Sequence, residues 1–222
     1  PYNITDKVIS LDEIYVASYA GSIPKLPEKV TCTKVSGAVT EEEVIWNTAN
    51  LDLRAYETAM ISGTTRDSGV PVNAKVEVIP KQSNELVYFV DASRDAGKES
   101  KAFELVSALT GSTLKNTVAD QEYTSESGWG RKGDVFRERT VSAGTDVSDK
   151  YQTGWYSSLK TAWLTYELML EAGSYELTAG FHEWWNNRSM KISVSGTNMD
   201  KVTSDAVSVS GVGDNASGSV KF

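Results

Sequence analysis

The sequence contains one cysteine, Cys32, and one histidine, His182. A lone cysteine excludes an internal disulfide and any zinc site built from several thiolates, and a lone histidine excludes a histidine-rich metal cluster. Long apolar runs are also missing. The longest covers residues 86–90, far short of the ~20 residues that a helix needs to span a bilayer. The sequence therefore predicts no membrane insertion. The kinds of site that remain are carboxylate or hydroxyl chemistry, calcium held by oxygens, and binding through aromatic surfaces.

Basic residues are outnumbered, with 22 lysines and arginines against 30 aspartates and glutamates in 222 residues, for a net charge of −8. An acidic surface repels phosphate groups, so we expect no nucleic-acid partner and no attraction to anionic membranes. The opening Pro1-Tyr2-Asn3 has no basic region, no apolar core and no initiator methionine, which is unlike a signal peptide. We therefore expect the chain to be part of a longer protein.

The aromatic residues are spread unevenly along the chain. Residues 1–80 hold five aromatic side chains, and residues 81–222 hold the other sixteen, including five of the six tryptophans. Between the two halves lies a polar stretch that a proline introduces, residues 80–84, as is typical of linkers. The sequence therefore predicts two domains, residues 1–80 and 84–222.

The first half is composed of short strand-like stretches, at residues 31–35, 43–46, 59–64 and 74–79. The last of them alternates alanine and valine with lysine and glutamate, the two-residue period of a half-buried strand. Strands at this spacing, separated by proline and glycine, predict a small all-β sandwich. We expect Trp46 to lie in its core, between the two sheets.

The order of four short motifs in this half resembles the group 4 bacterial immunoglobulin-like domains over about residues 10–80. The motifs are Leu26-Pro27 with Val30, then Val44-Ile45-Trp46, then Ser62-Gly63-Thr64, then Ala74-Lys75-Val76-Glu77-Val78. The resemblance implies a spacer domain from a secreted, multidomain, carbohydrate-active protein. The residues agree with a spacer, because this half has no aromatic cluster and no glycine-rich phosphate loop.

The second half begins with a mostly apolar strand at residues 85–92, followed by a helical pattern within 93–118. Phe103, Val106 and Leu109 recur there at helical spacing. Further strands are expected at 163–170, 175–182 and 188–194, and the last two predict a hairpin with Trp184 and Trp185 at its tip. We expect Trp163 and Tyr166, inside the first of these strands, to be core residues.

A second resemblance, over about residues 84–222, is to the malectin-like and galactose-binding-like β-sandwiches found beside bacterial glycoside hydrolase domains. It rests on Leu164-Thr165-Tyr166-Glu167-Leu168, Ala172-Gly173-Ser174-Tyr175-Glu176-Leu177, Gly180-Phe181-His182-Glu183-Trp184-Trp185, Arg188, Ser193-Val194-Ser195-Gly196, Tyr88-Phe89-Val90-Asp91-Ala92 and Trp129-Gly130-Arg131. The resemblance implies a carbohydrate-binding module. The disaccharide-binding residues of malectin itself are not carried over to positions of this sequence.

Three aromatic clusters are candidates for stacking on the flat C–H face of a sugar, with polar side chains nearby to meet its hydroxyls. The candidate ligand contacts are Trp184, Trp185, Glu183, Asn186 and Arg188 in the first cluster, Trp155 and Tyr156 in the second, Trp129 and Arg131 in the third, and Asp91 apart from them. The alternative interpretation of each ring is a structural residue of the core. The alternative interpretation of Arg188 and Glu183 is an ion pair across the neck of the hairpin. Alternation from Phe181 favours Trp184 as the ligand contact.

No catalytic signature selects particular residues from this sequence. A glycosidase needs two positioned carboxylates, and thirty acidic residues make some pair inevitable. A serine triad would have to use His182, and the sequence has no Gly-x-Ser-x-Gly elbow. We expect no catalysis and no cofactor. Structural calcium stays open, because loop carboxylates can supply oxygens; the candidates are Asp120, Asp134, Asp146 and Asp149.

Taken together, these patterns predict an all-β protein with two consecutive β-sandwich domains, the first immunoglobulin-like and the second galactose-binding or jelly-roll-like. The expected function is non-catalytic glycan binding within a larger secreted or cell-surface bacterial glycoside hydrolase. The expected partners are a glycan or polysaccharide and a neighbouring catalytic domain. The alternative is a pair of structural or adhesive spacers that bind no sugar, and a third option is an unrecognised glycosidase.

Overall fold

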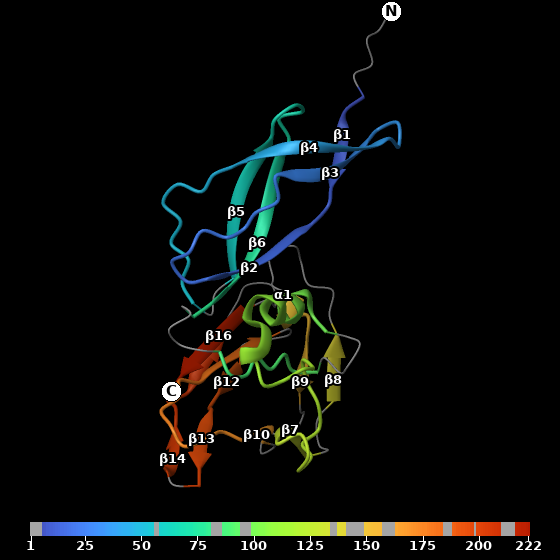
Figure 1. The fold of residues 1–222 in the computed structure, drawn as a ribbon. Helices are drawn as coiled ribbons and strands as arrows, with labels where there is room; N and C mark the ends of the chain where they lie inside the picture. The colour runs from blue at the N-terminus through green and yellow to red at the C-terminus, as the bar shows by residue number, and fades with distance from the viewer. Residues whose placement is uncertain are drawn as a thin grey trace, which may run out of the picture. The chain divides into compact units, whose positions relative to one another are not determined.

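The computed structural model describes residues 6–55, 58–80, 86–93, 99–133, 137–140, 149–156, 163–183, 188–197, 199–209 and 216–222. Strands dominate these residues, with one α-helix and two short 3-10 helices among them (Figure 1). The predicted all-β class is confirmed. The helix α1 has ten residues, and the described part of the chain contains no helix of the length and apolarity that a membrane span requires.

The chain divides into two compact units. The first unit is Pro1–Gln121 with Ser148–Lys150, and the second unit is Glu122–Val147 with Tyr151–Phe222. By their contacts, residues 86–93 and 99–121 therefore belong to the first unit, although the expected domain limit lies near residue 84. A division by contacts does not test which part folds alone, so the domains 1–80 and 84–222 stay a prediction.

The first unit is built on one six-stranded sheet that curls around its own core (Figure 1). Its strands are β1 (Val8–Leu11), β2 (Ile14–Tyr19), β3 (Lys29–Lys34), β4 (Val39–Trp46), β5 (Thr58–Thr65) and β6 (Pro71–Ile79). They lie in the order β1-β3-β4-β5-β6-β2, antiparallel except for the parallel pair β2 and β6. The predicted strands at 31–35, 43–46, 59–64 and 74–79 correspond to β3, β4, β5 and β6.

Trp46 packs against both apolar clusters of this sheet, as expected for a core tryptophan. One cluster is centred on Ile61 and Val76, and the other on Cys32 and Val72. The indole nitrogen of Trp46 donates a hydrogen bond to the carbonyl of Pro27 at 2.8 Å. The indole therefore buries its apolar body while its N–H keeps a partner.

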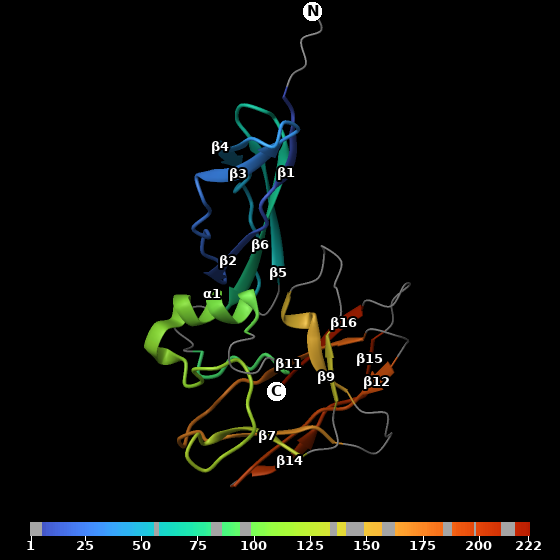
Figure 2. The same cartoon turned by 90° about the vertical axis from the view of Figure 1, so that its right-hand side faces the viewer.

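The predicted helix within residues 93–118 is α1 (Lys101–Thr110), followed by the 3-10 helix η1 (Gly111–Thr113). Its N-cap is Ser100, whose hydroxyl accepts a hydrogen bond from the Phe103 amide at 3.1 Å. Gly111 ends the helix at a positive φ of 60°, which glycine adopts without strain. The helix buries Phe103 and Val106, and it packs beside β2 in the first unit (Figure 2).

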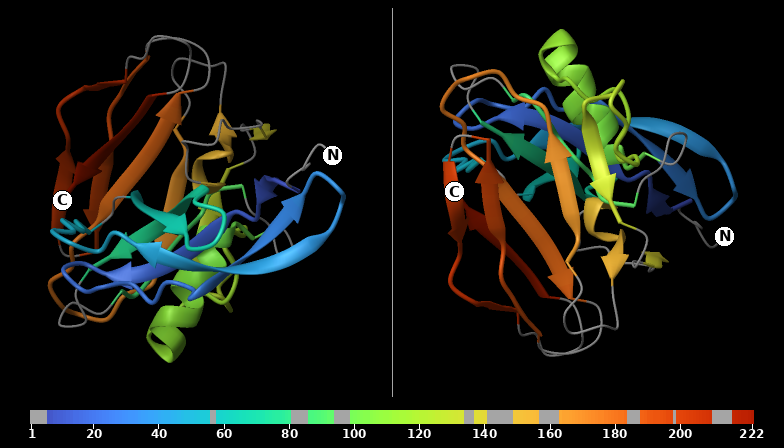
Figure 3. Two further views of the ribbon diagram at one scale, coloured as in Figure 1. Left: turned by 90° about the horizontal axis from the view of Figure 1, so that it is seen from above. Right: turned by 90° about the horizontal axis from the view of Figure 1, so that it is seen from below.

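Among the described residues, the second unit contains five antiparallel strand pairs. Figure 3 shows its later strands, in orange and red, from two further sides. Its strands are β7 (Trp129–Lys132), β8 (Arg137–Thr140), β9 (Thr153–Tyr156), β10 (Thr165–Leu168), β11 (Thr178–Glu183), β12 (Arg188–Met190), β13 (Ser193–Gly196), β14 (Met199–Thr203), β15 (Val207–Val209) and β16 (Ala216–Lys221). The pairs are β7 with β10, β8 with β9, β11 with β16, β12 with β15, and β13 with β14. A second 3-10 helix, η2 (Asp149–Tyr151), precedes β9.

The expected hairpin between residues 175–182 and 188–194 is wrong. Within the described residues, β11 pairs with β16 from Thr178 to Glu183, and β12 pairs with β15 from Arg188 to Met190. The two strands follow each other in the chain without pairing with each other. Alternation of apolar and polar residues shows that a stretch is a strand, and any antiparallel neighbour satisfies it.

Candidate functional site

The ladder between β7 and β10 separates the aromatic and charged residues of the second unit into two faces. Residues that lie opposite each other in a ladder point to the same side of the sheet, and successive residues point to opposite sides. The paired residues are Tyr166 with Arg131 and Leu168 with Trp129 on one face, and Thr165 with Lys132 and Glu167 with Gly130 on the other. We call the side of Tyr166, Arg131, Leu168 and Trp129 the inner face. The side of Thr165, Lys132, Glu167 and Gly130 is the outer face.

The inner face of this ladder is buried along β7 and half-buried along β10. Trp129 is 4% exposed and Arg131 is 9% exposed, while Tyr166 and Leu168 are half-buried. The guanidinium of Arg131 lies over the ring of Trp155, with its carbon 4.1 Å from the ring centroid. Such stacking suits a planar cation and an indole, because the ring face carries negative charge.

Arg131 has few partners for a cation at this depth. It donates to the carbonyl of Gly133 at 3.1 Å and to the exposed carboxylate of Glu122 at 3.5 Å. Its buried Nε has no hydrogen-bond acceptor. Because Trp155 faces this cation, its indole and the guanidinium stabilise the inner face together.

The outer face is open and carries an ion pair beside an aromatic ring. Lys132 and Glu167 form an ion pair, with side chains 46% and 48% exposed. The ammonium of Lys132 also lies 4.3 Å from the ring centroid of half-buried Tyr123. The hydrogen bond between Lys132 and Glu167 raises the pKa of the lysine and lowers the pKa of the carboxylate, so both stay charged near neutral pH.

Trp163 is the most exposed tryptophan for which the structure describes a side chain, at 59%. It lies two residues before Thr165, the first residue of β10, and four before Glu167; the two-residue period of that strand, continued to Trp163, predicts the same side as Glu167. The ammonium of Lys201, in β14, lies 5.1 Å from the centroid of its ring. We call the set of Tyr123, Lys132, Trp163, Glu167 and Lys201 the aromatic face.

The first predicted aromatic cluster lies mostly outside the described residues. Trp184, Trp185 and Asn186 fall in the undescribed residues 184–187. Glu183 and Arg188 are the last residue of β11 and the first of β12, and the structure describes their backbone without their side chains. Their expected contact with a glycan stays a prediction.

The other predicted contacts are described, and the structure brings only some of them together. Arg131 stacks on Trp155, buried Trp129 shares the inner face with Arg131, and half-buried Tyr156 follows Trp155 in β9. Asp91 lies in the first unit, 4% exposed, where its amide donates to the carbonyl of Ala119 at 2.9 Å. Whether any of these residues touches a sugar is untested, and Tyr156 and Trp155 are the more accessible among them.

The expectation that Trp163 lies in the core is wrong, whereas Tyr166 is half-buried. The apolar run Trp163-Leu164 suggested a buried strand. The polar residues Thr165 and Glu167, which share the period of Trp163, are the signal that could have placed it on the solvent-facing side.

The calcium candidates do not form a site in the described residues. Asp120 is 1% exposed, and its two carboxylate oxygens accept hydrogen bonds from the amides of Ser93 and Gln121 at 2.6 and 2.8 Å. Asp149 lies in η2, while Asp134 and Asp146 fall outside the described residues. No group of three metal-ligating side chains occurs in the part of the chain that the structure describes.

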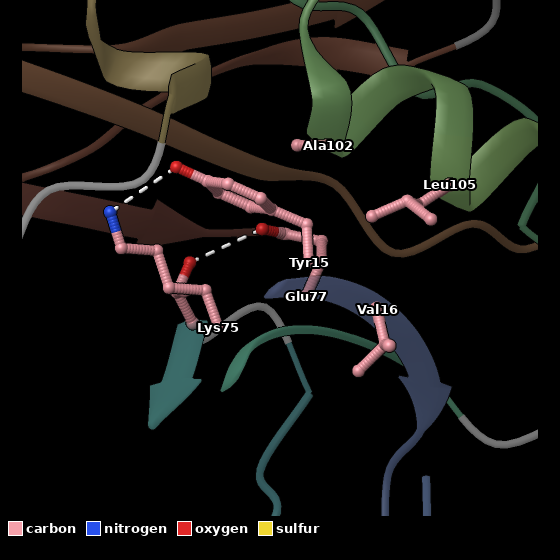
Figure 4. A pocket seen from close by; sticks show the side chains of 7 residues that line it. Tyr15, Val16, Lys75, Glu77, Ala102 and Leu105 are labelled. Carbon is pink, nitrogen blue, oxygen red and sulfur yellow. Dashed lines mark hydrogen bonds between the residues drawn. The ribbon is translucent and has the colours of Figure 1, made fainter. Parts of the chain in front are cut away.

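A small pocket in the first unit is lined by side chains that bind one another. It lies between β2, β6 and α1 (Figure 4). Lys75 donates to the hydroxyl of Tyr15 at 3.4 Å, and Thr58 donates to Glu77 at 3.2 Å. Because its polar groups bind one another, this pocket is a weaker ligand candidate than the aromatic face.

Comparison with the known protein families and a search of the curated proteins both find no match to this chain. Its function therefore has to be argued from its own residues and geometry.

Proposed function

We propose that this chain is a non-catalytic carbohydrate-binding part of a larger bacterial glycoside hydrolase, and that the aromatic face of the second unit receives the glycan. The observation that carries the proposal is Trp163, whose indole is 59% exposed two residues before β10, the strand that holds Glu167 of the Lys132–Glu167 ion pair. An exposed indole is costly in water, and it offers a large rigid surface on which a pyranose ring stacks.

The other residues of the aromatic face suit the rim of a sugar. Glu167 supplies charged acceptors and Lys132 supplies donors, and their mutual bond fixes both side chains before a ligand arrives. Tyr123 offers a second ring beside them. The inner face, where Arg131 stacks on Trp155, then acts as support.

The rest of the proposal follows the sequence resemblances. The first unit, with its curled sheet and Trp46 core, suits a spacer of the immunoglobulin-like kind in a secreted or cell-surface protein. A neighbouring catalytic domain would gain from the tether, because even weak binding raises its effective concentration on a polymeric substrate. Trp184 and Trp185 remain sequence-based candidates for the same glycan.

The test is a glycan array on the intact chain and on a Trp163→Ala variant. We expect the intact chain to bind a defined group of glycans, and Trp163→Ala to lower the affinity by about tenfold or more without lowering the melting temperature. The matched control is Ile45→Ala, because Ile45 is also 59% exposed but lies in the first unit. It should bind as the intact chain does.

Two results would contradict the proposal at different points. If the intact chain binds no glycan on a broad array, the alternative of structural or adhesive spacers is favoured. If the intact chain binds and Trp163→Ala binds equally well while Trp184→Ala does not, the function stands and the aromatic face is not its site.

A further inference from the structure

The ammonium of Lys201 is the feature of the aromatic face that a neutral sugar leaves unused. Its nitrogen lies 5.1 Å from the ring centroid of Trp163. β14 is exposed along its whole length, so the lysine reaches the ring from an open strand. None of the ion pairs found among the described residues includes Lys201.

The second lysine of the aromatic face, Lys132, differs from Lys201 because it has an acidic partner. Lys132 already pairs with Glu167 and lies over Tyr123, so its charge is balanced within the protein. Lys201 has the indole as its neighbour and no carboxylate in ion-pair range within the described residues. The chain has a net charge of −8, yet this lysine lies beside an exposed tryptophan and has no acidic partner among the described residues.

A neutral pyranose and Lys201 would compete for the same ring. Stacking of a sugar on that face of Trp163 displaces the ammonium and loses its attraction to the ring. A pyranose that carries an acid group changes this balance. In a uronate the carboxylate is attached directly to the ring carbon, so a stacked ring brings the carboxylate within reach of the flexible lysine, and a sulfate ester on a ring hydroxyl does the same.

We infer that the aromatic face binds an anionic pyranose, stacked on Trp163 with its acid group paired to Lys201. This inference rests on the proposed function and adds the charge class of the sugar to it. Uronate carboxylates and sulfate esters share the chemistry that the lysine recognises, and the experiment separates them.

The experiment uses the intact chain and pairs of probes that differ only in charge. One pair is an oligogalacturonide and its fully methyl-esterified form, and the other is a sulfated galactan oligosaccharide and its desulfated form. We expect at least one charged probe to bind tighter than its neutral partner by about three- to tenfold at low salt, with the difference shrinking as the salt concentration rises. The preferred pair identifies the acid group.

A variant then assigns the effect to the lysine. Lys201→Gln should remove most of the preference for the charged probe, by lowering the affinity for that probe toward the affinity for its neutral partner. Lys191→Gln is the matched control, since it removes the same charge from another exposed lysine of the second unit. Its preference for the charged probe should stay as in the intact chain.

The outcomes separate this inference from the proposed function. Equal binding of charged and neutral probes, or an unchanged preference in Lys201→Gln, overturns the inference and leaves glycan binding intact. Binding of neutral glycans on the array with no binding of either charged probe does the same. An intact chain that binds no glycan of any kind overturns the proposed function itself.

Discussion

Glu42 is a carboxylate that the first unit keeps charged although its residue is only 6% exposed. The hydroxyl and the amide of Ser68 both donate to one of its oxygens, at 2.6 and 3.0 Å. The hydroxyl bond is the largest cause that holds the pKa of Glu42 below its ordinary value of 4.5. A depressed folded pKa means that the charged form stabilises the fold.

This arrangement predicts a pH-dependent effect of Ser68→Ala on stability. The stabilisation by charged Glu42 is fully present above pH 4.5 and is lost as the pH falls from there through the lowered folded pKa. We expect Ser68→Ala to lower the free energy of unfolding by about 1.5–3 kcal/mol at pH 7, the usual worth of a hydrogen bond to a charged group. The loss should shrink toward pH 3, which urea titrations at several pH values measure.

Ser36 provides a control with the same two kinds of donor to a carboxylate in an exposed place. Its hydroxyl and amide donate to Asp6 at 2.7 and 3.0 Å, and these bonds are exposed. Ser36→Ala should change stability much less than Ser68→Ala. Equal losses in the two variants, or a Ser68→Ala loss that does not vary with pH, would show that the charge of Glu42 does not stabilise the first unit.

At the scale of the element, the pairing of β4 with β5 depends on a glycine. Gly63 lies opposite Trp46 in the ladder. A Cβ at this position would come within 2.8 Å of Trp46 Cε3 and 2.9 Å of Val44 Cγ1. Since Trp46 packs on both core clusters, its ring cannot move away without disturbing the core.

We therefore expect Gly63→Ala to destabilise the chain by about 1–3 kcal/mol, the usual cost of overpacking, even though alanine is less flexible in the unfolded state. Urea unfolding of the parent and the variant measures it. Ser62→Ala, at the exposed neighbouring position of β5, should stay within about 0.5 kcal/mol of the parent. A Gly63→Ala variant of parental stability would mean that the ring shifts freely.

Strands β3 to β6 were predictable, because their apolar residues alternate and proline or glycine separates them. β2 gave no such signal. Five of its six residues are half-buried, whichever side of the sheet they face, since β6 pairs with the strand and α1 packs beside it. Its sequence therefore does not alternate between apolar and polar residues. The same limit applies to partner choice: β11 and β12 read as strands, but only the folded chain shows their pairing with β16 and β15.

The candidate site shows how far the sequence reaches. The abundance of tryptophan after residue 80 drew attention to this half, and glycan binding there stays a prediction. Periodicity then misplaced Trp163, because two apolar residues before Thr165 resemble the start of a buried strand. The neighbours of Trp163 and Tyr123, which are Lys201 and Lys132, come from other segments, and no local pattern links them.

At the scale of the whole chain, stability depends on contacts between distant segments. In the first unit, Lys150 forms an ion pair with Glu77, 73 residues away. Both side chains are largely buried, at 13% and 5% exposure, and Thr58 also donates to Glu77. Residues 148–150 thus join the first unit through a charge pair that the sequence periodicity does not reveal.

Removal of one partner should be far more harmful than removal of both. Lys150→Met leaves the carboxylate of Glu77 buried without its cation, and we expect urea unfolding to show a loss of about 3–5 kcal/mol. The double variant Lys150→Met with Glu77→Gln should recover most of it, because no buried charge is left unpaired. The exposed pair of Arg54 and Asp52, 69% and 70% exposed, is the control, and Arg54→Met should cost under about 1 kcal/mol. If Lys150→Met costs no more than Arg54→Met, residues 148–150 contribute nothing through this pair to the stability of the first unit.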